Sequence, residues 1–149
     1  VALKTAQIIC QQLDADKIYD ALTQIKIPGR MEEIAPGIIV DVSHNIQGME
    51  GFVKTVEANF HGKKRILFAA SHKNEEEYMK NILKTIPEIE AFYTVGIHKR
   101  RIDEAEFQDA FRKMIDRNQE TTVCFVVGSF YLAGMAKEFI NQEEENVRL

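Results

Sequence analysis

A polar tripeptide, Ser43-His44-Asn45, directly follows an apolar run at residues 38–42 that contains one carboxylate, Asp41. The residues that come next have the apolar spacing of a helix: Met49, Phe52, Val53, Val56 and Phe60. The stretch therefore predicts a buried strand, a tight turn and a helix. Ligands of open α/β sheets bind at the carboxyl ends of strands, and helix N-termini favour anions. Because a carboxylate within an apolar strand is costly unless it is paired or ligand-bound, Asp41 and His44 are candidates for chemistry.

Polar turns also follow three further apolar runs, at residues 66–70, 91–95 and 123–127. If the strands are parallel, all four turns open on one edge of the sheet. The polar residues at this edge would be Asp41, Ser43, His44, Asn45, Ser71, His72, Lys73, His98, Lys99, Arg100, Arg101 and Ser129. An edge so rich in cations and hydroxyls suits an anionic ligand.

Several of these residues also have a purely structural explanation. Asn45 suits the N-cap of the following helix, and Gly128-Ser129 suits a strand-to-helix turn with a capping serine. The basic run at residues 99–101 is typical of a solvated patch, and His61 is typical of a helix end. A lone histidine such as His44 is more often a surface residue than a ligand, so both explanations stay open for it.

The elements that position these turns follow from the apolar spacing. Residues 2–13 and 17–25 predict two short helices, the second capped by Asp14 or Asp16. Residues 30–35 pair with 38–42 across Pro36-Gly37 as an antiparallel edge hairpin. Three later helices are predicted by the stripes Tyr78, Met79, Ile82, Leu83, Ile86; Phe107, Ala110, Phe111, Met114, Ile115; and Leu132, Met135, Ala136, Phe139, Ile140.

Continuous apolar runs separated by amphipathic helices predict parallel strands with both faces covered. We therefore expect an α/β fold, a Rossmann-like three-layer sandwich preceded by two short helices. Its sheet is mainly parallel with an antiparallel edge strand, and all four apolar runs lie in its buried centre.

The composition of the 149 residues, 45% hydrophobic with a net charge of -4, predicts one soluble domain without nucleic-acid or membrane affinity. We expect a cytoplasmic protein with Cys10 and Cys124 as buried reduced thiols and with no metal site. The chain opens without Met, and we take it as a fragment. No GxxxxGK[ST], GxGxxG or GxSxG motif is present, which argues against a self-contained nucleotide hydrolase or dehydrogenase.

Three ordered segments together resemble one family. Pro28-Gly29-Arg30, followed by the DVSHN segment at residues 41–45, resembles the PGR…DxxHN pair of folylpolyglutamate synthases, including the bifunctional dihydrofolate synthases. The GSFYLAG segment at residues 128–134 resembles their GSxYLxG segment. The resemblance implies that residues 1–27 are the last helices of a central ATPase domain. It implies that residues 28–149 are a C-terminal domain of the Mur ligase type.

This family joins glutamate to a folate carboxylate, which ATP first converts to an acyl phosphate. Its P-loop lies on the central domain, so the resemblance implies a partner domain on the same chain that holds the P-loop and the Mg²⁺ ligands. It implies ATP and Mg²⁺ as cofactors, folate and glutamate as substrates, and an inactive isolated fragment. Two alternatives stay open: another Mur-type ATP-dependent amide ligase, and a non-catalytic binding module.

The resemblance also implies roles for individual residues on the ATP side. Arg30 matches an arginine that contacts ATP phosphates, and His44 matches a histidine near them; both are the catalytic candidates. Asp41 matches an aspartate that contacts ATP through the ribose hydroxyls. The segment reads DVSHNI where the family commonly has DGAHNP, and the missing proline affects turn stiffness more than chemistry.

On the glutamate side, Ser129 matches a serine that holds glutamate, and Tyr131 lines the same pocket. The turn at residues 71–74, SHKN, stands where many relatives have a KDKD-like turn. Only Lys73 agrees with that pattern, so it is the candidate contact to the glutamate carboxylate.

Overall fold

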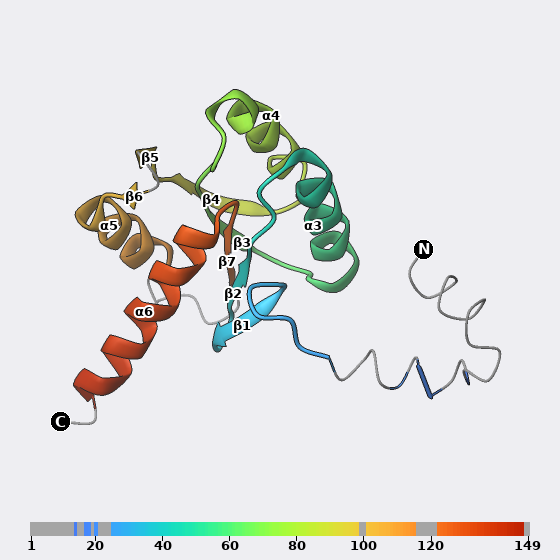
Figure 1. Ribbon diagram of the computed structural model, residues 1–149, viewed down its shortest axis with the longest axis horizontal. Coiled ribbons are helices and arrows are strands. Elements are labelled where there is room, and N and C mark those ends of the chain that lie inside the picture. The colour runs from blue at the N-terminus through green and yellow to red at the C-terminus, as the bar shows by residue number, and fades with distance from the viewer. Residues whose placement is uncertain are drawn as a thin grey trace.

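A five-stranded sheet in the order β1-β2-β7-β3-β4 forms the centre of the computed structural model, which describes residues 14, 17–18, 20, 25–98, 101–115 and 122–147 (Figure 1). Its strands are β1 (Glu32–Ala35), β2 (Ile38–Asp41), β3 (Lys64–Phe68), β4 (Ile89–Thr94) and β7 (Val123–Val127). Strand β1 pairs antiparallel with β2, whereas the β2–β7, β7–β3 and β3–β4 pairs are parallel. The predicted mainly parallel sheet with an antiparallel edge strand is confirmed.

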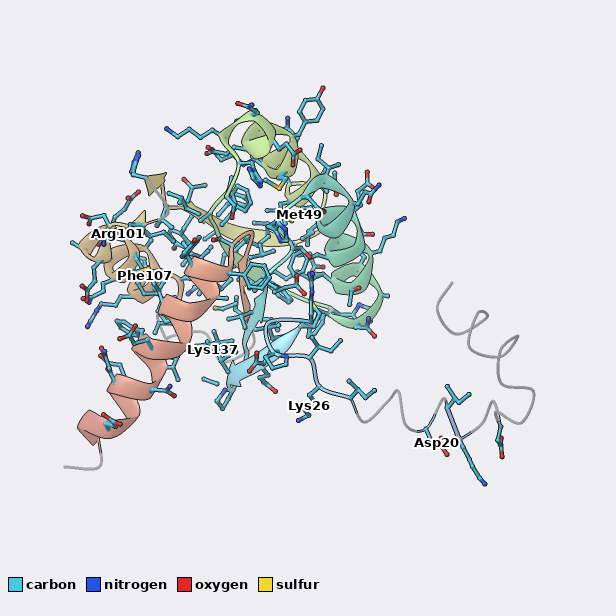
Figure 2. The ribbon with its side chains drawn as sticks, viewed as in Figure 1. Asp20, Lys26, Met49, Arg101, Phe107 and Lys137 are labelled. Carbon is cyan, nitrogen blue, oxygen red and sulfur yellow. The ribbon has the colours of Figure 1, made fainter. Side chains whose placement is uncertain are left out.

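Two pairs of helices cover the two faces of this sheet (Figure 1). Helices α3 (Ile46–Asn59) and α4 (Lys73–Leu83) lie on one side, and α5 (Glu104–Met114) and α6 (Phe130–Val147) lie on the other. Figure 2 shows Met49 of α3 and Phe107 of α5 on opposite sides of the sheet. Alternate strand residues enter separate cores, because successive side chains of a strand point to opposite faces: Val40 packs with the α5 and α6 side, Ile39 with the α3 and α4 side.

Three predictions about these elements need correction. Strand β4 is an edge strand rather than part of the buried centre, and only part of its surface is covered. Tyr78 is 68% exposed, because a helix turns about 100° per residue and the buried stripe of α4 runs through Met79 and Leu83. The turn at 96–103 contains a small antiparallel pair, β5 (Ile97–His98) and β6 (Arg101–Ile102), which the apolar pattern did not predict.

Most of the two predicted N-terminal helices lies outside the described residues, as do Asp16, Lys99, Arg100 and Cys10. Asp14 accepts a long hydrogen bond of 3.5 Å from the backbone N–H of Lys17, at the position predicted for a cap. Cys124 is buried, as predicted. Among the described residues, no helix has the length and apolarity needed to cross a bilayer.

Candidate active site

The carboxyl ends of the four parallel strands form one edge of the sheet. The last residues of β2, β7, β3 and β4 lie side by side in register: Asp41 with Val127, Val127 with Phe68, and Phe68 with Thr94. The turns that follow these strands therefore open on the same edge, as predicted. This edge brings the segment at 43–45, which lies near the N-terminus of the chain, next to the segment at 128–131.

The turn before β1 lies against the end of β2. The N–H of Val42 donates to the Gly29 carbonyl at 2.8 Å, and Gly29 has a φ of 74°. A side chain at Gly29 would begin 2.9 Å from Cγ1 of Val42, so the turn needs a glycine for both its φ and its close approach. Met31 also has a positive φ, 43°, which is uncommon for a residue with a side chain. Arg30 thus stands between two residues with positive φ, and the positive φ of Met31 is a form of strain that clusters at functional sites.

Asp41 joins this turn to the end of β2. Its Oδ1 accepts from the N–H of Ser43 at 2.8 Å, and its Oδ2 accepts from the N–H of Met31 at 3.0 Å. Nη1 of Arg30 lies 3.4 Å from Oδ1 of Asp41 and donates to Oγ of Ser43 at 3.1 Å. Asp41 is only 4% exposed, so these donors offset the cost of burying a carboxylate in a strand. The predicted pairing of Asp41 is therefore met by its own chain, and the side chain of Arg30 remains 45% exposed.

The turn at 43–45 is fixed at both ends. Asn45 caps α3, since its Oδ1 accepts from the N–H of Gly48 at 2.8 Å, which confirms its structural role. His44 is half-buried, and its Nδ1 lies 2.9 Å from the carbonyl oxygen of Val42. The ring of His44 also packs against Phe130, with 5.5 Å between the ring centroids. His44 therefore has partners from two segments far apart in the sequence.

Gly128 fixes the second segment of the edge. Its φ is 109°, and a side chain there would begin 2.5 Å from the carbonyl oxygen of Ala69. The next residue, Ser129, is 1% exposed, and its Oγ accepts from the N–H of Tyr131 at 3.1 Å. Ser129 thus makes the local capping contact that the structural explanation predicted. Tyr131 is 45% exposed beside it.

The remaining candidates lie apart from the cluster formed by Arg30, Asp41 and Ser43. Lys73 is exposed at the first residue of α4, and the side chain of the preceding His72 makes no capping hydrogen bond. Within the described part of the chain, no hydrogen bond or ion pair joins Lys73 or Tyr131 to the cluster. The structure therefore joins Arg30 to Asp41 and Ser43, and it places His44 beside the segment of Ser129 and Tyr131 through Phe130. Lys73 lies apart from both groups.

Two residues that the sequence motifs did not indicate support the arginine turn. Oε2 of Glu32 accepts from the N–H of Gly29 at 2.5 Å and from Nζ of Lys137 at 2.6 Å. Figure 2 shows Lys137 on α6, the helix that starts at this edge of the sheet. These two hydrogen bonds, with the larger effect from Lys137 and the smaller from Gly29, hold the pKa of Glu32 below its ordinary value. No sequence signal pairs Glu32 with Lys137, because only the folded chain brings α6 to β1.

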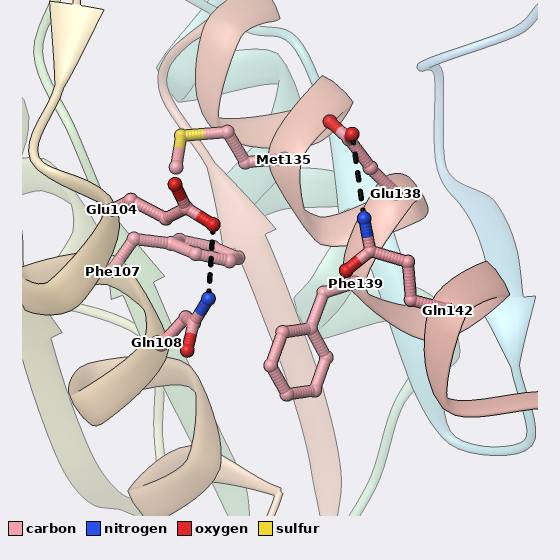
Figure 3. Close-up of a pocket in the computed structure, with 7 residues that line it drawn as sticks. All are labelled: Glu104, Phe107, Gln108, Met135, Glu138, Phe139 and Gln142. Atoms are coloured by element: carbon pink, nitrogen blue, oxygen red, sulfur yellow. Dashed lines mark hydrogen bonds between the residues drawn. The ribbon is translucent and has the colours of Figure 1, made fainter. Parts of the chain in front are cut away.

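Neither a metal cluster nor the hollow between α5 and α6 adds to this site. Among the described residues, no group of three or more His, Cys, Asp or Glu side chains could hold a metal ion. A hollow of about 150 Å³ lies between α5 and α6, with Phe107, Met135 and Phe139 among its lining residues (Figure 3). Its polar side chains bond to one another, Gln108 to Glu104 and Gln142 to Glu138. It contains none of the candidate residues.

The fold is that of an α/β domain with a polar edge, and comparison with known proteins gives its family. The sequence model of the family described as "Mur ligase, glutamate ligase domain" matches residues 29–130, and the chain belongs to this family. The resemblance found from the motifs is thereby confirmed at the level of the family. No curated protein sequence matches the chain.

Solved structures of folate ligases share the fold. E. coli FolC in complex with DHPP and ADP has a TM-score of 0.73 at 17% identity, over 89% of this chain and 36% of that one. The L. casei FPGS in its apo form has a TM-score of 0.68 at 20% identity, over 93% and 34%. The bifunctional folylpolyglutamate synthase/dihydrofolate synthase from Yersinia pestis, complexed with AMPPNP and Mn ion, has a TM-score of 0.67 at 18% identity, over 87% of this chain and 35% of that one. The chain thus spans about a third of the length of these proteins, and the likeness shows a common fold.

Proposed function

We propose that residues 28–149 form the C-terminal, ATP- and glutamate-contacting domain of a ligase that adds glutamate to folates. The observation that carries this proposal is the site at the carboxyl edge of a Mur ligase-type domain, where Arg30, Asp41 and His44 gather around the end of β2. The ligands named for similar structures give support: one bifunctional synthase was solved with Mn, AMPPNP and L-glutamate bound.

Arg30 would hold the phosphates of ATP. Only its Nη1 has a protein acceptor among the described residues, through Asp41 and Ser43. The other N–H groups of the guanidinium fork can therefore meet phosphate oxygens, for which the fork has matching geometry. Charge that develops on a transferring phosphoryl group would be stabilised by an arginine held in this way.

Asp41 and His44 would complete the ATP side. Oδ2 of Asp41 accepts one hydrogen bond in the structure, and a carboxylate oxygen can accept a second, which a ribose hydroxyl of bound ATP would supply. His44 would lie near the phosphates. When bound, ATP would supply the phosphoryl group that activates the folate carboxylate as an acyl phosphate.

Ser129, Lys73 and Tyr131 would contact glutamate. We further propose that residues 1–27 are the last helices of a central domain on the same chain. That domain would hold the P-loop, the Mg²⁺ ligands and part of the folate site. The described residues of this chain do not suit a metal, so no role here is assigned through one. In this arrangement the isolated chain has half of an active site, and we expect a cytoplasmic enzyme.

The first experiment is an assay of the isolated chain for ATP hydrolysis that depends on folate and glutamate. We expect none, because the chain has no phosphate-binding loop. Purified chain that releases ADP only when glutamate is present, with contaminating ATPases excluded, would contradict the division of the active site.

The second experiment is steady-state kinetics on the full-length enzyme with ATP and glutamate varied separately. Arg30→Ala should lower turnover by about 10²–10³-fold, as for loss of one electrostatic transition-state contact. Asp41→Ala should weaken mainly ATP binding, by roughly 1–3 kcal/mol, and Ser129→Ala mainly glutamate binding. Arg112→Ala is the matched control, since Arg112 is exposed and pairs with Glu143 rather than with a residue of the cluster. A kinetically silent Arg30→Ala would refute the assignment.

The same assay separates the alternatives. A different Mur-type amide ligase would turn over with another amino acid in place of glutamate, or with another carboxylate in place of folate. A non-catalytic binding module would show no turnover with any acceptor, although it could still bind ATP. Either result would overturn the proposed function and leave the family assignment intact.

A further inference from the structure

Phe130 is the most exposed aromatic residue next to the candidate site. It is 61% exposed, although the two residues before it, Gly128 and Ser129, are buried. An exposed phenylalanine at a site edge gains little from burial, so its stability contribution does not explain its presence there. Its ring lies 5.5 Å from that of His44, centroid to centroid, at an interplanar angle of 50°.

The hydrogen bond of His44 to the backbone fixes the chemical form of its ring. Nδ1 of His44 lies 2.9 Å from the carbonyl oxygen of Val42. A carbonyl oxygen can only accept, so Nδ1 must hold the proton of this bond. In the neutral imidazole, Nε2 is then the atom with the free lone pair. Among the described residues, none forms a hydrogen bond to Nε2, so this is the nitrogen that a ligand can reach.

Both partners of the His44 ring are themselves held in place. The carbonyl of Val42 shares its peptide with the N–H of Ser43, which donates to Oδ1 of Asp41 at 2.8 Å, and the N–H of Val42 donates to the Gly29 carbonyl at 2.8 Å. The position of Phe130 depends on Gly128, whose φ of 109° and close approach to the Ala69 carbonyl leave no room for a side chain. The hydrogen bond at Nδ1 alone would allow the ring to turn about it, and the aromatic contact with Phe130 restrains that motion.

We propose that Phe130 is a positioning residue for His44, which holds the imidazole in the Nδ1–H tautomer with Nε2 available to a ligand. The claim about the ring stands on the geometry alone. The identity of the ligand, a phosphate of ATP, rests on the proposed function. Phe130 acts through His44 and needs no contact with the substrate.

Long-range ¹H–¹⁵N NMR of the imidazoles in the full chain tests this proposal. Spectra are recorded at alkaline pH, where free imidazole is neutral. His44 should show the Nδ1–H pattern, while the exposed His61, His72 and His98 provide internal references. In Phe130→Ala the ratio of Nδ1–H to Nε2–H forms should fall by about fivefold, as expected for loss of one aromatic pair contact.

Three variants make the result decisive. Phe130→Tyr keeps the ring and should keep the wild-type spectrum of His44. Phe130→Leu keeps apolar bulk without the ring, and it replaces the alanine variant if that variant does not fold. Tyr78→Ala removes another exposed aromatic residue and should leave His44 unchanged. An Nε2–H pattern in the wild type, or an unchanged His44 in both Phe130→Ala and Phe130→Leu, would overturn the proposal.

Titration with ATP then separates this proposal from the proposed function. If both hold, ATP shifts the His44 signals in the wild type, and the shift weakens in Phe130→Leu. If His44 has the expected tautomer and depends on Phe130, but ATP shifts nothing in the isolated chain or in the full-length enzyme, the positioning role stands and the ATP assignment fails.

Discussion

The two glycines of the GSFYLAG segment lie in different surroundings: the backbone at Gly128 requires a glycine and the backbone at Gly134 does not. Gly→Ala substitutions at the two positions should therefore have opposite effects on stability. Gly128 has a φ of 109°, and a side chain there would begin 2.5 Å from the Ala69 carbonyl oxygen and 2.7 Å from the Phe68 ring. Gly134 lies on the exposed side of α6, where a Cβ atom would meet nothing within 4 Å. We expect Gly128→Ala to destabilise the domain and Gly134→Ala to stabilise it.

The magnitudes follow from the two environments. A residue forced into a sparsely populated backbone region costs about 1–3 kcal/mol, and overpacking costs about as much again. Gly128→Ala should therefore lower the free energy of unfolding by roughly 2–6 kcal/mol. Gly134→Ala should raise it by up to about 1 kcal/mol, the difference in helix propensity. At about 2–4 °C per kcal/mol for a chain of this size, Tm falls by roughly 4–24 °C in the first and rises by a few degrees in the second.

Thermal and urea unfolding followed by circular dichroism measures both effects. Gly51→Ala provides the matched control, since Gly51 lies in α3, outside the motif and away from the edge, with open space around it. It should behave like Gly134→Ala. If Gly128→Ala changes the free energy of unfolding as little as Gly51→Ala does, the strained turn before α6 is not a requirement of the fold. The placement of Ser129 and Phe130 by that turn would then lose its physical basis.

Three further predictions concern the polar groups. Asp41→Asn should cost roughly 1–3 kcal/mol of unfolding free energy, because an amide cannot accept with both of its polar atoms from the N–H groups that Asp41 now binds; urea unfolding checks this, and an unchanged midpoint would contradict it. Folding lowers the pKa of Glu32 from its ordinary value of 4.5. The ion pair of Glu32 with Lys137 therefore stabilises the fold above pH 4.5, and this stabilisation is lost as the pH falls through the lower pKa of the folded state. Lys137→Met should therefore flatten the loss of stability below about pH 4.5 in urea midpoints measured from pH 7 to pH 3, and an equal slope in both proteins would refute this. Burial raises the pKa of the Cys124 thiol to about 11, so in a Cys10→Ser variant iodoacetamide at pH 8 should label Cys124 only after urea is added, and rapid labelling of the native chain would argue otherwise.

The strands at the centre of the sheet could be predicted because their apolar pattern is local. All four residues of β2 are buried, as are the last four of β7, in keeping with continuous apolar runs covered on both faces. The hairpin between β1 and β2 was also predictable, since Gly37 after Pro36 supplies the positive φ that the turn needs, 74°.

The position of a strand within the sheet could not be predicted in the same way. Strand order depends on which crossovers the chain makes, and β7 from the end of the chain pairs between β2 and β3. This places β4 at an edge although its run at residues 91–95 suggested a strand of the buried centre. The start of β3 was missed for a different reason. Lys64 and Arg65 look like loop residues, yet both are buried because their charged ends reach partners beyond the strand: Lys64 the carbonyls of Gly62 and Pro87, Arg65 the carboxylate of Glu90.

The candidate site likewise has one part that the sequence indicates and another that only the folded chain creates. Arg30 and Asp41 are joined by a short hairpin; the sequence indicated both the hairpin and the motif, and the structure adds the contact between the two side chains. The contacts of Glu32 with Lys137 and of His44 with Phe130 link the start of the domain to α6. Such contacts depend on the closure of the whole sheet, and neither residue type nor spacing along the chain indicates them.

The hydrogen bonds of Asp41 also explain how Arg30 can be both fixed and available. The backbone N–H groups of Ser43 and Met31 bond to Asp41 at 2.8 and 3.0 Å, whereas Arg30 lies at 3.4 Å. A phosphate that draws Arg30 away would leave the buried carboxylate with its two shorter hydrogen bonds, so its oxygens would keep their backbone donors while the cationic partner moves to the phosphate. The ion pair joins a buried carboxylate to an arginine side chain that is 45% exposed. The arginine is therefore held near the edge by the longest of these contacts, while the two backbone hydrogen bonds that close the turn do not depend on it.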